Sequence, residues 1–163
     1  MIIFSPKRGF TLIELMVTVA IVALLTSIIM VSFSTARGKS RDGKRVSDVG
    51  QIQIALELFY DRCKQYPATV ANPTSGITAA TCPSGVNLST FISQIPAPSS
   101  GSYTYAVNAS PATDYVLMTT LENYSEVLKD DLDGSFVYST TVDCGTANNG
   151  QGNAERNYCV GPK

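Results

Sequence analysis

The sequence predicts an α+β protein in which one long N-terminal helix packs on a small antiparallel β-sheet with disulfide-bounded loops. Three observations support this fold class: an apolar run near the N-terminus, an amphipathic segment that follows it, and strand-like segments in the second half. With 163 residues, of which 44% are hydrophobic, the chain has room for one modest domain and an apolar anchor. We divide it into a short N-terminal segment, an apolar helix, an amphipathic continuation of that helix and a globular head: residues 1–9, 10–33, 34–65 and 66–163.

The apolar run predicts a membrane-spanning helix over residues 10–33. From Leu15 to Phe33 the sequence has no charged residue, proline or glycine. At about 1.5 Å per residue this stretch is roughly 28 Å long, which spans a bilayer core. Glu14 stands at its N-terminal edge, where a carboxylate without a partner is costly. Either Glu14 has a functional partner, or it is the incidental charge of an anchor that lies near the lipid headgroups.

The residues around Glu14 resemble a known motif. Lys7-Arg8-Gly9 followed by Phe10-Thr11-Leu12-Ile13-Glu14 is similar to the processing site of the type IV pilin superfamily, which includes the type II secretion pseudopilins. The resemblance implies that a prepilin peptidase cleaves between Gly9 and Phe10, so that residues 1–9 are a leader peptide, and that the new Phe10 amine is methylated. It also implies that the chain assembles into a filament through residues Phe10, Thr11, Leu12, Ile13 and Glu14.

In that superfamily the carboxylate at the position of Glu14 meets the N-terminal amine of a neighbouring subunit, and opposite charges attract strongly in a low-dielectric core. An assembly ATPase and a membrane platform protein are implied partners. The resemblance places the chain in the cytoplasmic membrane before assembly and in a cell-surface or periplasmic filament afterwards. The main hypothesis is therefore a pilus-like structural subunit. The alternatives are the major pseudopilin of a type II secretion system and a membrane-anchored extracytoplasmic binding module that never polymerises.

The segment after the apolar run predicts a continuation of the helix to about Lys64. Apolar residues recur there at spacings of three and four, with polar residues between them: Val46, Val49, Ile52, Ala55, Leu56, Phe59, Tyr60 and Cys63. Tyr66-Pro67 ends the predicted helix. Gly38, Gly43 and Gly50 each weaken it by up to about 1 kcal/mol relative to alanine. The basic cluster at 41–45 has two interpretations. It contacts lipid headgroups or an acidic surface of the next subunit, or it is simply a solvated helix face.

The second half predicts loops and three strands in an antiparallel meander. Residues 68–101 are rich in proline, glycine and serine and predict a loop. The strand candidates are 102–107, 114–121 and 135–142, each rich in tyrosine, valine and threonine. Residues 143–163 have little apolar content and predict a loop. The tyrosines of this half are expected to pack within the sheet rather than to bind a ligand.

Four cysteines, all beyond the apolar run, predict two disulfides in an oxidising compartment. We favour Cys63 with Cys82 and Cys144 with Cys159, because each pair closes a short loop. Export of the head agrees with this prediction. Export conflicts, however, with the positive-inside rule, because more basic residues follow the apolar run than precede it.

Composition argues against several other functions. The sequence has no histidine, which removes most acid–base and triad mechanisms. We therefore expect that the protein is not an enzyme. Loss of residues 1–9 would leave 10 basic and 13 acidic residues and a net charge of about −3, which disfavours nucleic acid as a partner. Asp130, Asp131 and Asp133 offer carboxylates for Ca²⁺, as in the C-terminal loops of type II secretion pseudopilins, but Asp-Leu-Asp-Gly also suits a plain turn.

Overall fold

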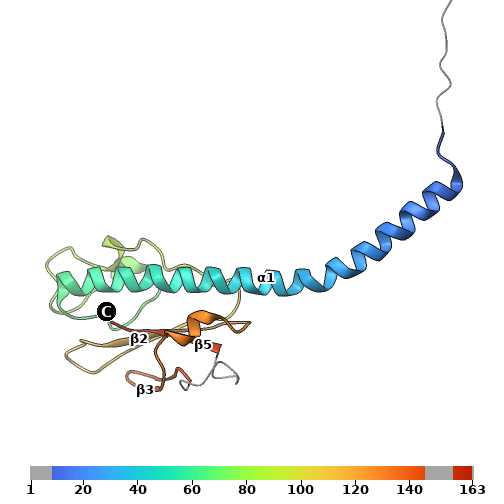
Figure 1. Ribbon diagram of the computed structural model, residues 1–163. Coiled ribbons are helices and arrows are strands. Elements are labelled where there is room, and N and C mark those ends of the chain that lie inside the picture. Colours follow the sequence, from blue (N-terminus) through green and yellow to red (C-terminus); the bar gives the residue numbers. More distant parts are fainter. Residues whose placement is uncertain (1–8, 146–155, 163) are drawn as a thin grey trace, which may run out of the picture. The chain divides into compact units, whose positions relative to one another are not determined.

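A computed structural model describes residues 9–145 and 156–162, without the side chains of residues 28–32. The chain forms two compact units, Met1–Arg37 and Gly38–Lys163. The second unit contains the sheet, all four cysteines and the part of α1 from Gly38 onward. From here on, the head means this whole unit and not only residues 66–163. The architecture is α+β, with a long N-terminal helix and an antiparallel sheet, as the sequence predicts (Figure 1). The two predicted disulfides are also present.

Helix α1 runs from Leu12 to Cys63, close to the predicted bounds. It ends three residues before Tyr66, because Lys64 adopts a left-handed conformation with φ of 56°. The Lys64 N–H still donates to the Tyr60 carbonyl oxygen, at 2.6 Å. A left-handed residue just beyond the last helical one is a common way to end a helix.

The main sheet of the head has three antiparallel strands in the order β1-β2-β5. Their bounds are Tyr103–Val107, Tyr115–Thr120 and Asn157–Val160. The central strand β2 pairs Leu117 with Tyr105 of β1 and Met118 with Cys159 of β5. Most of β2 is buried, because both faces of the sheet are covered.

Two parts of the predicted meander are wrong. The predicted strand 135–142 is a hairpin of β3 (Ser135–Val137) and β4 (Thr141–Asp143), which forms a separate two-stranded sheet. The predicted loop 143–163 contains β5, which takes the place in the main sheet that the meander gave to the third strand. Both errors concern three- or four-residue strands, and segments this short have too little periodicity to be recognised.

The core lies between α1 and one face of the sheet. Successive turns of α1 supply its buried apolar side chains: Val49, Ile52, Leu56, Phe59 and Cys63. Tyr115 and Leu117 of β2 meet them from the sheet, and Leu88 meets them from the loop that follows the helix. A second, smaller cluster packs Val116 of β2 against Val142 of β4 on the opposite face. The β3–β4 hairpin thus covers the sheet face that α1 leaves open.

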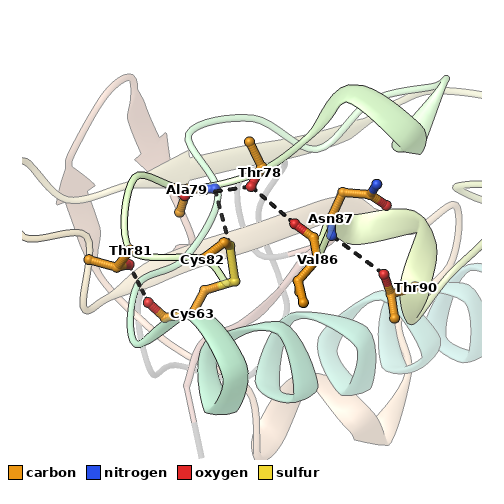
Figure 2. The surroundings of a disulfide bond; sticks show 8 residues. All are labelled: Cys63, Thr78, Ala79, Thr81, Cys82, Val86, Asn87 and Thr90. Carbon is orange, nitrogen blue, oxygen red and sulfur yellow. Dashed lines mark hydrogen bonds between the residues drawn. A yellow bond between two sulfur atoms is a disulfide. The ribbon is translucent and has the colours of Figure 1, made fainter. Parts of the chain in front are cut away.

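The loop after α1 is tied to the helix end by the Cys63–Cys82 disulfide (Figure 2). It contains the short 3₁₀ turns η1 (Thr74–Gly76) and η2 (Leu88–Thr90). Thr81 Oγ1 donates to the Cys63 carbonyl oxygen, and Thr78 Oγ1 donates to the Val86 carbonyl oxygen at 3.2 Å. The second disulfide joins Cys144 to Cys159. Both are the sequential pairs that the sequence favours.

The basic cluster at 41–45 is part of an intramolecular ion-pair network, so the interpretation as a solvated face is wrong for Arg45. The Arg45 side chain is only 3% exposed and pairs with Asp42 at 2.9 Å and with Glu122 at 2.8 Å. Asp42 also accepts hydrogen bonds from the backbone N–H groups of Glu122 and Asn123. Arg41 forms a more exposed pair with the same Glu122, and hydrogen bonding to Arg41 lowers the pKa of the Glu122 carboxyl. The network therefore fixes the segment after β2 to the first turns of α1 within the head.

We predict that Arg45→Ala destabilises the head by about 3 kcal/mol, because it leaves the buried Asp42 carboxylate without its cation. The matched control is Arg41→Ala. Its side chain is 41% exposed, so the loss should stay below about 1 kcal/mol. Urea unfolding of the detergent-solubilised chain, followed by circular dichroism, measures both. Equal losses in the two variants would contradict the dominant role of Arg45.

Candidate functional site at the N-terminus of α1

The start of α1 is a capping box built from Thr11 and Glu14. Glu14 Oε2 accepts hydrogen bonds from the backbone N–H and from Oγ1 of Thr11, both at 2.8 Å. The Glu14 N–H in turn donates to Thr11 Oγ1 at 3.3 Å. This reciprocal pattern satisfies backbone donors that a helix otherwise leaves free at its first turn. Sequence analysis missed it, although Thr-x-x-Glu before an apolar run is its signature.

The predicted processing residues lie just outside the helix. Gly9 and Phe10 are non-helical and exposed, and the Phe10 side chain is 91% exposed. A Cβ at Gly9 would meet nothing within 4 Å. Lys7 and Arg8, which complete the predicted motif, lie outside the described residues. The Gly9–Phe10 peptide bond is thus in an accessible, irregular segment next to a fixed helix start.

The first turns of α1 expose apolar side chains that the described residues of their own unit leave uncovered. Leu12, Ile13 and Leu15 are all more than half exposed. Phe10, Ile13, Glu14, Val17 and Thr18 line a shallow hollow of about 390 Å³. The hydroxyls of Thr18 and Ser27 donate to carbonyl oxygens of their own helix, at 2.9 and 2.8 Å. This surface is suited to an apolar partner, with the Glu14 carboxylate at its edge.

The membrane span stays a prediction. In the part of the chain whose side chains are described, no helical stretch meets the joint requirement of length and hydropathy for crossing a bilayer. Residues 28–32, which belong to the predicted span, lie outside that part.

The predicted calcium ligands Asp130, Asp131 and Asp133 gain no support from the side-chain positions. Asp131 Oδ2 accepts a hydrogen bond from the Cys159 N–H at 2.9 Å, next to the bond from the Leu132 N–H to the Cys159 carbonyl oxygen. Asp131 thus caps the outer edge of β5. Within residues 9–145 and 156–162, no three acidic, cysteine or histidine side chains lie close enough together to hold a metal ion.

The tyrosines of the sheet are packed, as expected for core residues. Tyr115 stacks edge-on with Tyr66, and its hydroxyl donates to Glu57 on α1 at 3.2 Å. The Tyr103 hydroxyl donates to Asp48 at 2.8 Å. Burial and this bond raise the pKa of Tyr103. These hydroxyls join the sheet to the buried Asp48 and the half-buried Glu57 on α1. Tyr124 differs, because it lies outside the strands and is partly exposed.

Comparison with known proteins agrees with the N-terminal geometry. The prokaryotic N-terminal methylation motif matches residues 4–30. Type II secretion system core protein G of Escherichia coli K12 is 29% identical over 118 residues, which are 71% of this chain and 81% of that protein. The same protein of Klebsiella michiganensis is 31% identical over 79 residues, or 48% of this chain and 56% of its own length.

The type IV major fimbrial protein FimA of Dichelobacter nodosus is 35% identical over 75 residues, which are 45% of each chain. No solved structure matches significantly. The chain therefore has the methylation motif of prepilins. The resemblance to the type IV pilin and type II secretion pseudopilin superfamily, predicted from Lys7 to Glu14, is confirmed.

We predict that Asp131 makes head stability depend on pH. Burial, together with the nearby Asp133 carboxylate, raises the pKa of Asp131 to about 6, against the opposing effect of the Cys159 hydrogen bond. The unfolded value is about 3.9. The stabilising contribution of the protonated carboxyl is therefore complete below about pH 4 and lost as the pH rises through about 6.

Thermal unfolding of the wild type and of Asp131→Asn across this range measures the effect. The wild type should lose stability relative to the variant as the pH rises, whereas Asp130→Asn, in the same loop, should follow the wild type. A difference between wild type and Asp131→Asn that does not change with pH would refute the assignment.

Proposed function

We propose that this protein is the precursor of a structural subunit of a type IV pilus-like filament. It is cleaved after Gly9, methylated on Phe10, held in the membrane by residues 10–33 and polymerised through α1. The observation that carries this proposal is the match of the methylation motif to residues 4–30, together with the pilins and pseudopilins among the relatives. The accessible Gly9–Phe10 bond and the exposed apolar start of α1 support it.

The capping box gives Glu14 a second role beside the pairing with a neighbour's amine. A carboxylate can accept about four hydrogen bonds, and Thr11 uses only one of its two oxygens, Oε2. Capping therefore fixes the side chain while leaving it able to bind the methylated amine of a neighbouring Phe10. Such a fixed carboxylate loses little rotamer entropy on pairing. In an apolar filament core the pair would then set the axial register of each added subunit.

One comparison favours the pseudopilin alternative over a surface pilus. The match to core protein G extends over 71% of the chain, whereas the match to FimA covers 45%. A subunit of a type II secretion pseudopilus is therefore the second candidate. In either case the protein acts as a structural subunit, depends on a prepilin peptidase, an assembly ATPase and a platform protein, and ends in a surface or periplasmic filament.

We predict that co-expression with a prepilin peptidase removes residues 1–9 and leaves a methylated Phe10, and intact-mass spectrometry measures both changes. The control is the same chain expressed without the peptidase. An uncut chain, in cells where the peptidase processes a known substrate, would favour the anchored binding module instead.

We predict that Glu14→Gln is processed but absent from sheared filaments. Glutamine can replace glutamate in a capping box, so this variant keeps the helix start and loses only the charge that would meet the amine. Thr11→Val is the matched control, because it removes the capping hydroxyl and keeps the Glu14 charge. If Glu14→Gln assembled as well as the wild type, the charge pair would have no role in register.

A further inference from the structure

A groove of about 530 Å³ lies in the head between α1 and the segment that follows β2. Sites that hold a small organic molecule are typically of this size. One wall comes from successive turns of α1 and the other from residues 123–127. We call it the Lys39 groove. The lining residues that matter below are Lys39, Gly43, Val46, Tyr124, Ser125 and Val127.

Lys39 gives this groove a positive charge that the described part of the chain does not compensate. Its side chain is exposed and forms no ion pair with a described residue. The two acidic residues of the lining already have partners. Asp42 pairs with Arg45 at 2.9 Å, and Glu126 pairs with Lys129 at 2.6 Å. The ammonium group of Lys39 is therefore available to an anion.

Two hydroxyl groups and two apolar side chains complete the lining. The hydroxyls of Tyr124 and Ser125 make no hydrogen bond to a described residue, and Tyr124 is 40% exposed. Val46 and Val127 are half-buried. Hydroxyl and ammonium donors suit phosphate oxygens, whereas the valines suit the carbon atoms of an organic group. The combination fits a phosphate ester better than a bare inorganic anion.

Gly43 keeps this groove open. A Cβ at Gly43 would meet nothing within 4 Å, although glycine within a helix is about 1 kcal/mol less favourable than alanine. Because Gly43 lines the groove, a side chain there would occupy part of it. Gly38 differs, because a Cβ there would approach Asn123 Nδ2 to 2.6 Å. Packing within the head thus explains the glycine at 38, whereas a ligand in the groove would explain the one at 43.

We propose that the Lys39 groove binds the phosphate of a phospholipid headgroup while residues 10–33 hold the chain in the membrane. The inference rests on the proposed function, which supplies the membrane. The six residues from Phe33, at the end of the apolar run, to Lys39 are helical and rise about 9 Å. The headgroup layer on each side of a bilayer core is about 5–8 Å thick. Lysines close to the end of a membrane helix can reach that layer, and anionic lipids attract them.

The other basic side chains of this part of the head are less suited to the headgroup. Arg41 and Arg45 are both paired with Glu122, so the lipid contact considered for the cluster at 41–45 does not fall on them. Lys44 is exposed, but it does not line the groove, and its ammonium group lies 3.5 Å from the Ala97 carbonyl oxygen. Lys44 is therefore the matched control for Lys39: an exposed cation on the same helix, without the groove.

The test titrates the full chain in detergent with phosphatidylglycerol and counts bound lipids by native mass spectrometry. Lys39→Gln should weaken lipid binding by roughly tenfold, because a hydrogen bond to a charged group is lost. Lys44→Gln changes the net charge by the same amount and should bind like the wild type. Gly43→Leu should also weaken binding, because its side chain fills the groove. Its unfolding temperature should equal or exceed that of the wild type, since leucine favours helix.

Equal binding by Lys39→Gln and Lys44→Gln would overturn this inference, because lipid would then respond only to overall charge. Displacement of the lipid by excess inorganic phosphate would also overturn it, since the groove would then be a site for the free anion. The titration uses the uncleaved chain and no peptidase. A failure of processing would therefore refute the proposed function, whereas wild-type-like binding by Lys39→Gln would refute only this inference.

Discussion

The packing of α1 against β2 is the contact on which the rest of the head depends. Phe59 of the helix and Tyr115 and Leu117 of the strand are fully buried in the same cluster. Because β2 is also the central strand, its pairing with β1 and β5 places both neighbours at once. The side of β2 that faces away from α1 then needs its own cover, which the β3–β4 hairpin provides through Val142. The disulfides and the Arg45 network add further links between segments that this packing brings together.

The Arg45 network shows how a charged segment can be necessary to a core. Burial removes Arg45 and Asp42 from water, and the free-energy cost of this desolvation can exceed the attraction between the two charges. Asp42 compensates by also accepting two backbone N–H groups after β2, which would otherwise need partners of their own. The Arg45 network thus fixes the position of the turn after β2, which no strand pairs with at this point.

Local sequence signals predicted the elements that depend on local interactions. The periodicity of α1, the strands β1 and β2, the two short disulfide loops and the residues around Glu14 were all recognisable. The hairpin β3–β4 and the strand β5 were not, because each has only three or four residues and is stabilised by distant partners: Met118 with Cys159 is an example. The role of Arg45 was also hidden, since its partner Glu122 is 77 residues away. In contrast, the Thr11–Glu14 capping box is a local signal that could have been found.

Some features of α1 are not explained by the fold of a single copy. Most of the central strand β2 is buried within the head, whereas the first turns of α1 expose apolar side chains with the Glu14 carboxylate beside them. A helix that served only to support the head would tend to lose an exposed apolar surface, because such a surface favours aggregation. The proposed assembly through α1 would cover this surface with other copies of the chain. Ile52, Leu56 and Phe59 meanwhile hold the other side of α1 against the sheet of the head.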